Sequence, residues 1–329
     1  MAQRDTPLPS GNRLHTENEL APRTGVQTGV TAEELPKTRV SSPGRDAIRR
    51  FRQNWAAMIS LAVILIMILL AIFAHFAHTG DPFAIDYGNF DGNPSSNHWF
   101  GTDGLGRDQY TRLIYGLRVP LIVGIVGAVI TTTIGTLVGL ISAYSGGFVD
   151  SLLARFTDLI FAFPAFVLSV LVVSLYGQAM DSYAGGAGRV IVLTVVFSFI
   201  GWPAIMRFVR GLSLSMKEQQ FVEAARTSGS SSWRILIRHL LPNMYGLILI
   251  QSSFLVIGFV YNEAVLSILG LGVQPPNPDL GVMLANGAAR LDYNAWEAVI
   301  PSIVISMIIL AFTFLGDGVR DAFDPRGNA

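Results

Sequence analysis

The residues able to do chemistry in this chain are few and scattered. The five histidines stand at positions 15, 75, 78, 98 and 239, so His75 and His78 alone could share a helix face as metal ligands. Neither a His-Glu-x-x-His zinc pattern nor a Gly-x-x-x-x-Gly-Lys-Ser/Thr phosphate loop occurs. Gly101–Gly106 has a Gly-x-x-Gly-x-Gly spacing, but no predicted strand precedes it, and we interpret it as a turn. The sequence therefore predicts no catalytic residue and no metal site.

One polar stretch, from Glu223 to Pro242, has residue types suited to recognition. It begins as a predicted helix with Phe221, Val222 and Ala225 on one side, and Gly229 stands where a helix end commonly needs a left-handed residue. A second apolar-periodic segment follows and closes at Leu241-Pro242; its apolar positions are Trp233, Leu236, Ile237 and Leu240. This pattern predicts a helix, a turn and a helix that bind a soluble partner. The alternative is an interfacial helix that only links two membrane spans.

Composition indicates a membrane protein. The 329 residues are 51% hydrophobic and 14% charged, with a mean hydropathy of +0.47. Soluble domains carry nearer a quarter charged residues. The formal net charge is zero, which gives no basic field for nucleic acid, and the absence of cysteine excludes disulfides.

Six apolar runs are candidates for membrane-spanning helices, which need about 20 residues each. The third contains Pro164, and the fifth begins just after Pro242, a residue suited to a helix start. The predicted spans are Ala56–Phe76, Val119–Ala143, Leu159–Tyr176, Val190–Met206, Asn243–Asn262 and Ala298–Gly316.

Lys and Arg residues orient these spans. From Lys37 onward, the inferred cytoplasmic segments hold 15 of them and the outer segments hold five: Arg107, Arg112, Arg118, Arg189 and Arg290. Because cytoplasmic segments are enriched in Lys and Arg, both termini and the polar stretch are predicted to be cytoplasmic. Residues 1–44 lack an apolar region and are predicted to be a disordered cytoplasmic tail.

The two longer outer segments lie between the first and second predicted spans and between the fifth and sixth. Tyr110, Leu113, Ile114 and Leu117 have the spacing of an amphipathic helix that leads into the second span. Glu263 stands at the outer boundary of the fifth span, so we expect a hydrated carboxylate there.

Several separated motifs resemble a known family. Glu223-Ala-Ala, Gly229 and His239-x-Leu-Pro242 are similar to the loop with which membrane subunits of ATP-driven importers dock their ATPases. Gly101-Thr-Asp-Gly-Leu-Gly-Arg-Asp108, Leu269-Gly-Leu-Gly272 and Leu315–Arg326 resemble blocks of the dipeptide/oligopeptide/nickel permease family. Ile268 and Leu280 depart from its usual Phe and Trp. The resemblance covers residues from about 45 to 326, and the chain looks like the permease with the shorter outer domain.

The resemblance implies an all-α membrane fold, that of a type I importer permease with six transmembrane helices and a cytoplasmic coupling helix. Residues 45–118 would hold the first span and an outer loop, and 119–326 the permease core with a docking loop at about 213–242. ATPase coupling would fall to Glu223, Ala224, Ala225, Gly229, His239 and Pro242. An outer gate or binding-protein contact would fall to Asp103, Arg107, Asp108, Glu263, Gly270 and Gly272.

The resemblance also implies partners. A homologous second permease would form the other half of the path, two cytoplasmic subunits would bind ATP and Mg, and an extracytoplasmic binding protein would deliver substrate. The chain itself would bind no cofactor or nucleic acid and would lie in a prokaryotic inner membrane.

Peptides, nickel chelates and oligosaccharides stay open as cargo. Thr132, Gln251 and Ser252 are candidate polar positions of the path. An ion-gradient-driven secondary transporter is the alternative class, but it would need a carboxylate at mid-membrane, and the span centres are uncharged.

Overall fold

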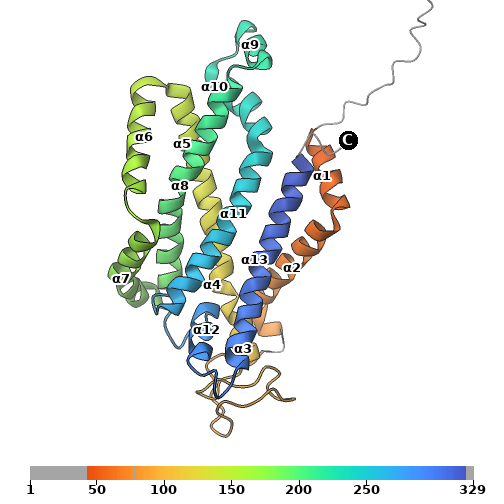
Figure 1. The fold of residues 1–329 in the computed structure, drawn as a ribbon, viewed down its shortest axis with the longest axis vertical. Coiled ribbons are helices and arrows are strands. Elements are labelled where there is room, and N and C mark those ends of the chain that lie inside the picture. Colours follow the sequence, from red (N-terminus) through yellow and green to blue (C-terminus); the bar gives the residue numbers. More distant parts are fainter. Residues whose placement is uncertain (1–42, 78, 324–329) are drawn as a thin grey trace, which may run out of the picture. The chain divides into compact units, whose positions relative to one another are not determined.

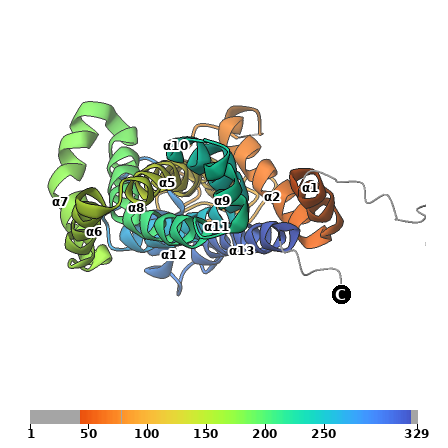
Figure 2. The same cartoon turned by 90° about the horizontal axis from the view of Figure 1, so that it is seen from above.

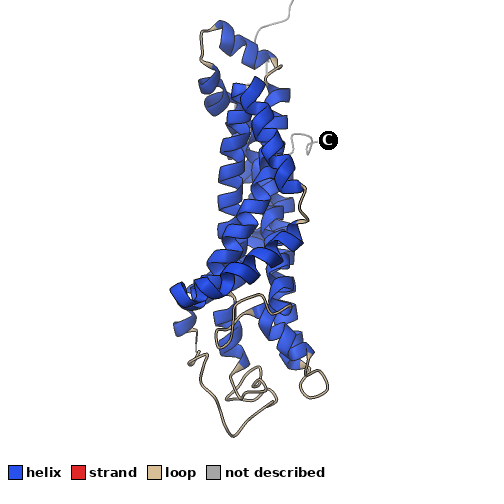
Figure 3. Cartoon of the chain, turned by 90° about the vertical axis from the view of Figure 1, so that its left-hand side faces the viewer, coloured by secondary structure: helices blue, strands red, loops and turns tan. Residues whose placement is uncertain are grey.

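The computed structural model describes residues 43–77 and 79–323, and this part of the chain consists of helices and connecting loops (Figure 3). In chain order the helices are α1 (Pro43–Gln53), α2 (Trp55–Ile72), η1 (Ala74–Phe76), α3 (Gln109–Gly116), α4 (Arg118–Leu121), η2 (Ile122–Val126), α5 (Gly127–Ser145), α6 (Gly147–Phe161), α7 (Ala165–Ala184), η3 (Gly185–Ala187), α8 (Gly188–Met216), α9 (Gln220–Thr227), α10 (Ser232–Ile235), η4 (Leu236–Leu240), α11 (Leu241–Ile268), α12 (Leu280–Ala288) and α13 (Trp296–Phe323). The predicted tail lies outside the described residues except for Pro43 and Gly44, which begin α1.

Five helical stretches in the described part are long and apolar enough to cross a membrane: 55–72, 109–145, 165–216, 232–268 and 296–323. The stretch 165–216 contains two helices, α7 and α8, which pack against each other on either side of Gly185. Gly185 has a φ of +59°, a left-handed conformation that glycine adopts without steric cost and that ends α7. The all-helical membrane fold expected from hydropathy is therefore confirmed.

The third predicted span was wrong as a single helix. Phe161 ends α6 and Ala165 begins α7, so the predicted span Leu159–Tyr176 contains a break at 162–164. Pro164 stands at the end of this break, with φ −57° and ψ 118°. Its ring removes an N–H donor and disfavours helical geometry in the preceding Phe163, so α6 cannot continue through it. In Figure 2, α6 and α7 lie on one side of the bundle, with α1, α2 and α13 on the other.

Small residues hold the centre of the bundle together. Gly135 and Gly139 of α5 face α8, where a Cβ on Gly135 would lie 2.5 Å from Ile205 Cβ. A Cβ on Gly139 would lie 2.8 Å from the Met206 carbonyl oxygen. A Gly-x-x-x-Gly pair of this kind lets two membrane helices approach closely. The close approach of α5 and α8 therefore depends on Gly135 and Gly139 having no side chain.

Two polar contacts fasten the ends of neighbouring helices to each other. Asn54 donates from Nδ2 to Asp321 Oδ2 at 3.2 Å, which ties the start of α2 to the end of α13. Asp150 of α6 accepts two hydrogen bonds from Arg210 of α8, at 2.5 and 2.6 Å. The hydrogen bond from Arg210 lowers the pKa of Asp150 to about 2, so this carboxylate is charged at neutral pH.

The helices that were predicted to lie on the same side of the membrane lie at the same end of the bundle. In Figure 1, α9, α10, α1 and the end of α13 lie at one end of the helices. The loop before α3, together with α12, lies at the opposite end. The described structure thus separates the polar stretch from the segment that carries Asp103 and Asp108.

Candidate functional site

The helix α9 contains Glu223, Ala224 and Ala225 of the predicted docking loop. Glu223 and Ala224 are exposed, and Ala225 is half-buried. Val222 is fully buried in a cluster that includes Leu236, Leu240 and Met244. One face of α9 is therefore anchored on the bundle while the face with Glu223 and Ala224 is open to a partner.

Gly229 ends this helix as predicted. Its φ is +79°, and the Ser230 N–H donates to the Ala225 carbonyl oxygen at 3.1 Å. The Ser228 N–H donates to the Ala224 carbonyl oxygen, also at 3.1 Å. Together the left-handed glycine and the bond from Ser230 form a Schellman-type helix end, which turns the chain toward α10.

The second half of the loop differs from the predicted periodicity. Ile235, Leu236 and Leu240 are buried, whereas Trp233 and Ile237 are partly exposed. Leu236 and Leu240 are buried as predicted, whereas the exposed Ile237 lies inside the π-helical turn η4 (residues 236–240), where the side-chain spacing differs from that of an α-helix. His239 is half-buried in this turn, and Pro242 is exposed in the first turn of α11.

Two contacts fasten the loop to the end of α5. Lys217 donates from Nζ to the Ala143 carbonyl oxygen. The Trp233 and Tyr144 rings meet edge to face with their centroids 5.9 Å apart. The predicted docking loop is therefore attached both to α11, which continues it, and to α5.

The predicted outer residues Asp103 and Arg107 form a buried ion-pair cluster with Arg112. Asp103 Oδ2 lies 2.7 Å from a terminal nitrogen of Arg107 and 3.7 Å from Arg112 Nε. Arg112 also donates to the carbonyl oxygens of Pro82 and Pro276, at 3.1 and 3.2 Å. All three charged side chains are at most 9% exposed. In this chain alone they hold outer segments together and present little surface to a binding protein.

The expectation of a hydrated Glu263 was wrong. Its side chain is buried, with 1% exposure, and Ser267 Oγ donates to it at 2.7 Å. The chain after α11 folds back over this position, because Gly272 and Gly281 have no side chain and pack directly on Ser267.

The other predicted outer residues take different positions. Gly272 is buried, whereas Gly270 is exposed with a φ of +78°. Asp108 is half-buried and accepts the Thr111 N–H at 2.7 Å as the N-cap of α3. Asp279, which the sequence did not single out, is fully buried ahead of α12, and burial raises the pKa of its carboxyl.

The candidate path residues meet between α5 and α11. Thr132 Oγ1 and Ser252 Oγ lie 2.8 Å apart, and Gln251 is half-buried beside Ser252. Ser252 also donates to the Ile248 carbonyl oxygen, at 2.8 Å. These side chains are partly accessible and mutually bonded, so the structure brings Thr132 and Ser252 together but leaves their role in a path as a prediction.

Arg290 was not predicted from the sequence to be a site residue. Its guanidinium lies 2.5 Å from Asp91 Oδ2 and 4.0 Å from Glu297 Oε2, and it lies over Gly104. Arg290 and Glu297 lie between the end of α12 and the first turn of α13, whereas Asp91 and Gly104 lie in the loop before α3, so no local pattern could indicate contact between these two segments.

The metal alternative gains no support. Among residues 43–77 and 79–323, no group of three His, Cys, Asp or Glu side chains is placed to hold a metal ion. His78 lies outside the described residues.

Family models match most of the chain. Residues 135–328 match the binding-protein-dependent transport system inner membrane component, which covers the helices from within α5 and the whole docking loop. Residues 42–95 match the N-terminal transmembrane domain of oligopeptide transport permease C.

Individual proteins are similar over nearly their whole length. The glutathione transport system permease protein GsiD of Escherichia coli is 38% identical over 302 residues, 91% of this chain and 96% of the relative. The oligopeptide transport system permease protein OppC of Haemophilus influenzae is 36% identical over 284 residues, 86% of this chain and 88% of the relative. A solved inward-facing structure of the MetNI methionine ABC transporter aligns with 64% of this chain and 96% of that chain, at 19% identity and a TM-score of 0.49.

The family-model match includes the segment in which Glu223 and Ala224 are exposed on α9 and Gly229 follows the end of that helix. The secondary-transporter alternative is thereby set aside. The chain belongs to the family of inner membrane permease components of binding-protein-dependent ABC importers, and it is a non-catalytic, multi-pass subunit of such a transporter.

Proposed function

We propose that the chain is one of two homologous permeases of a bacterial importer for di- and oligopeptides, and that α9 couples it to a cytoplasmic ATPase. The observation that carries the coupling role is the display of α9: Val222 is buried while Glu223 and Ala224 are exposed. Peptide cargo is supported by the substrates for which the similar permeases are named, glutathione and oligopeptides. Nickel chelates and oligosaccharides stay as alternative cargoes of the same machinery.

The coupling proposal follows from how the loop is attached. A soluble ATPase that binds the open face of α9 would push on α10, η4 and α11 as one continuous helical stretch, Ser232–Ile268. The contacts from Lys217 and Trp233 would carry the same displacement to α5. Thr132 of α5 and Ser252 of α11 lie farther along these two helices, so closure of two ATPases would change the spacing of the candidate path.

The remaining partners follow from the same scheme. A second permease would supply the other half of the path, and two ATP-binding subunits would hold the ATP and Mg. A binding protein would deliver cargo to the end that carries the loop before α3, with both termini of this chain in the cytoplasm. These assignments have support from the Lys and Arg distribution and from the grouping of α1, α9 and the end of α13 in Figure 1.

The first test is purification of the tagged chain from its native membrane in a mild detergent. We expect a second permease and two subunits with a Gly-x-x-x-x-Gly-Lys-Ser/Thr loop to be identified with it by mass spectrometry. In liposomes, the complex should take up a radiolabelled dipeptide only with ATP and the binding protein. A chain that purifies alone and moves solute down an ion gradient would overturn the proposal.

Substituting Gly229 with Val should uncouple the loop. A Cβ at this position meets no atom within 4 Å, so the effect would come from the backbone, whose φ of +79° is strained for a β-branched residue. The strain costs about 1–2 kcal/mol, so we expect cargo-stimulated ATP hydrolysis to fall by roughly tenfold. Asn tolerates this conformation, so Gly229→Asn is the matched control and should keep most of the stimulation. Equal stimulation in Gly229→Val and the unmodified complex would contradict the role of this turn.

A further inference from the structure

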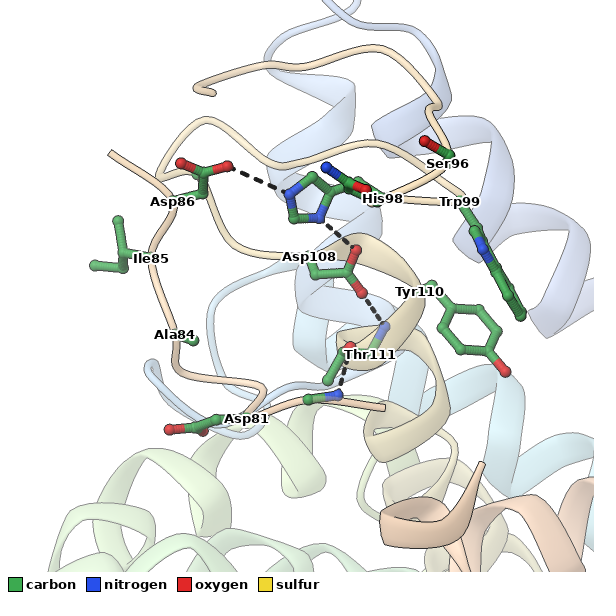
Figure 4. A pocket seen from close by; sticks show the side chains of 13 residues that line it. Asp81, Ala84, Ile85, Asp86, Ser96, His98, Trp99, Asp108, Tyr110 and Thr111 are labelled. Atoms are coloured by element: carbon green, nitrogen blue, oxygen red, sulfur yellow. Dashed lines mark hydrogen bonds and ion pairs between the residues drawn. The ribbon is translucent and has the colours of Figure 1, made fainter. Parts of the chain in front are cut away.

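The loop between η1 and α3 encloses a pocket that ATPase coupling does not use (Figure 4). Its volume is about 340 Å³, at the low end of pockets that hold small molecules. The lining residues come from residues 80–111, and the side chains that matter here are Asp81, Asp86, His98, Trp99, Asp108 and Tyr110. The pocket lies in the outer loop, away from Thr132 and Ser252 within the bundle.

Backbone contacts give this pocket a defined shape. The Asp86 N–H donates to the Gly106 carbonyl oxygen at 2.8 Å, and the Gln109 N–H donates to the Gly101 carbonyl oxygen at 3.1 Å. A Cβ on Gly106, whose φ is +75°, would lie 2.4 Å from the Asp86 carbonyl oxygen. The first half of the loop is thus fastened at Asp86 to the turn at Gly106 that leads into α3.

The lining is negatively charged whichever form His98 takes. His98 lies between two carboxylates, with Nδ1 2.9 Å from Asp108 Oδ1 and Nε2 3.4 Å from Asp86 Oδ2. Asp81 adds a third carboxylate, and none of the lining residues is Lys or Arg. Even a doubly protonated His98 would leave this set with two more negative than positive charges.

Aromatic rings form the facing wall. The Trp99 and Tyr110 ring centroids are 4.9 Å apart, and Tyr110 donates from its hydroxyl to the Ala77 carbonyl oxygen at 3.0 Å. In Figure 4 these rings lie on one side of the pocket, with Asp81 and Asp86 on the other. Trp99 is 51% exposed. Aromatic faces attract cations, so both walls favour the same kind of ligand.

We propose that this pocket receives the side chain of a Lys or Arg presented by the extracytoplasmic binding protein. Charge complementarity selects a cation, and the pocket volume can accommodate the side chain of one Lys or Arg. The placement in the outer loop selects a docking protein over cargo in the path. This inference rests on the proposed function, because only a binding-protein-dependent permease has such a partner.

A direct binding test uses the complex purified with 5-fluorotryptophan in lipid nanodiscs. The Trp99 fluorine resonance is assigned with Trp99→Phe and followed during titration with the capped tripeptide acetyl-Gly-Arg-Gly-amide. We expect a shift that saturates in the millimolar range and weakens with salt, because the attraction is electrostatic. The citrulline analogue, which is similar in shape but uncharged, should bind about tenfold more weakly. Equal binding of both peptides would overturn the proposal.

Two variants test whether the pocket carboxylates bind the Arg peptide. Asp81→Asn combined with Asp86→Asn removes two charges but keeps the Oδ1 acceptors of the Phe83 and Gly88 N–H groups. This double variant should lose the Arg-peptide shift. Asp292→Asn removes a charge from another exposed position of the outer surface and should retain it.

The partner itself is tested by ATP hydrolysis in the reconstituted complex as the binding protein is titrated. The double variant should raise the half-saturating concentration by about tenfold, with basal and maximal rates unchanged, and Asp292→Asn should leave all three unchanged. If the binding protein stimulates the unmodified complex and the double variant with the same half-saturating concentration, the docking pocket is overturned but the proposed function is not. A change in the KM for cationic cargo at unchanged half-saturation would also overturn it, in favour of a cargo site. An unmodified complex that no binding protein stimulates would count against the proposed function.

Discussion

Replacing Asp103 with Ala is expected to destabilise the folded chain by about 3–5 kcal/mol, because it would leave two buried guanidinium groups without their carboxylate. Arg107 and Arg112 are 9% and 3% exposed at their side chains, so water cannot replace the lost partner. Asp103 Oδ1 also accepts the Leu105 and Arg107 N–H groups, both at 2.9 Å. The loop before α3 would therefore lose its backbone shape as well as an ion pair.

The measurement is the temperature at which the detergent-solubilised chain stops eluting as a single species in fluorescence-detected size exclusion. Asp103→Asn should have an intermediate value, since it keeps an oxygen for the two N–H groups but loses the charge. Asp292→Asn serves as the control for charge, because Asp292 is exposed. If Asp103→Ala retained the transition of the unmodified protein, the cluster would not stabilise the outer segments.

The second large effect is expected from Gly135→Leu. Even the Cβ would lie 2.5 Å from Ile205 Cβ and 2.8 Å from the Trp202 carbonyl oxygen. Because one of these atoms belongs to the backbone of α8, the helices would have to separate. Overpacking of this kind costs about 1–3 kcal/mol, occasionally more. We expect a lower yield of assembled complex and a lower transition temperature.

Gly211→Ala is the matched control for this substitution. Gly211 lies in α8 as well, but a Cβ there meets no atom within 4 Å. Ala in an exposed helix position is favoured over Gly by roughly 0.5–1 kcal/mol. The control should therefore be neutral or slightly stabilising. Similar losses in Gly135→Leu and Gly211→Ala would show that close α5–α8 packing is not the cause.

Patterns that depend on neighbouring residues predicted the structure well. The spacing of Leu113, Ile114 and Leu117 identified α3, and all three are buried. Gly229 was recognised as a helix end from its position alone, and its φ of +79° agrees. Hydropathy located the membrane helices because each has to satisfy its backbone hydrogen bonds within itself.

Features that depend on distant residues could not be predicted in this way. Glu263 is buried because chain from beyond α11 folds over it, a fact absent from the sequence around Glu263 itself. The cluster of Asp103 with Arg112 includes carbonyl groups as far away as Pro276. The π-turn at 236–240 has no composition that distinguishes it from an α-helix, so the exposure of Ile237 was not predicted.

The unbroken helical stretch Ser232–Ile268 has a mechanical consequence. Its 37 residues span roughly 55 Å at 1.5 Å per residue. A stiff rod of this length amplifies rotation: a tilt of about 10° around its middle would move each end by about 5 Å, in opposite directions. One end of this stretch starts just after the turn at Gly229, and the other end carries Glu263 and Ser267. A rigid-body tilt of this kind would link opening of the path on one side of the membrane to its closing on the other side, without any change in the conformation of the helix.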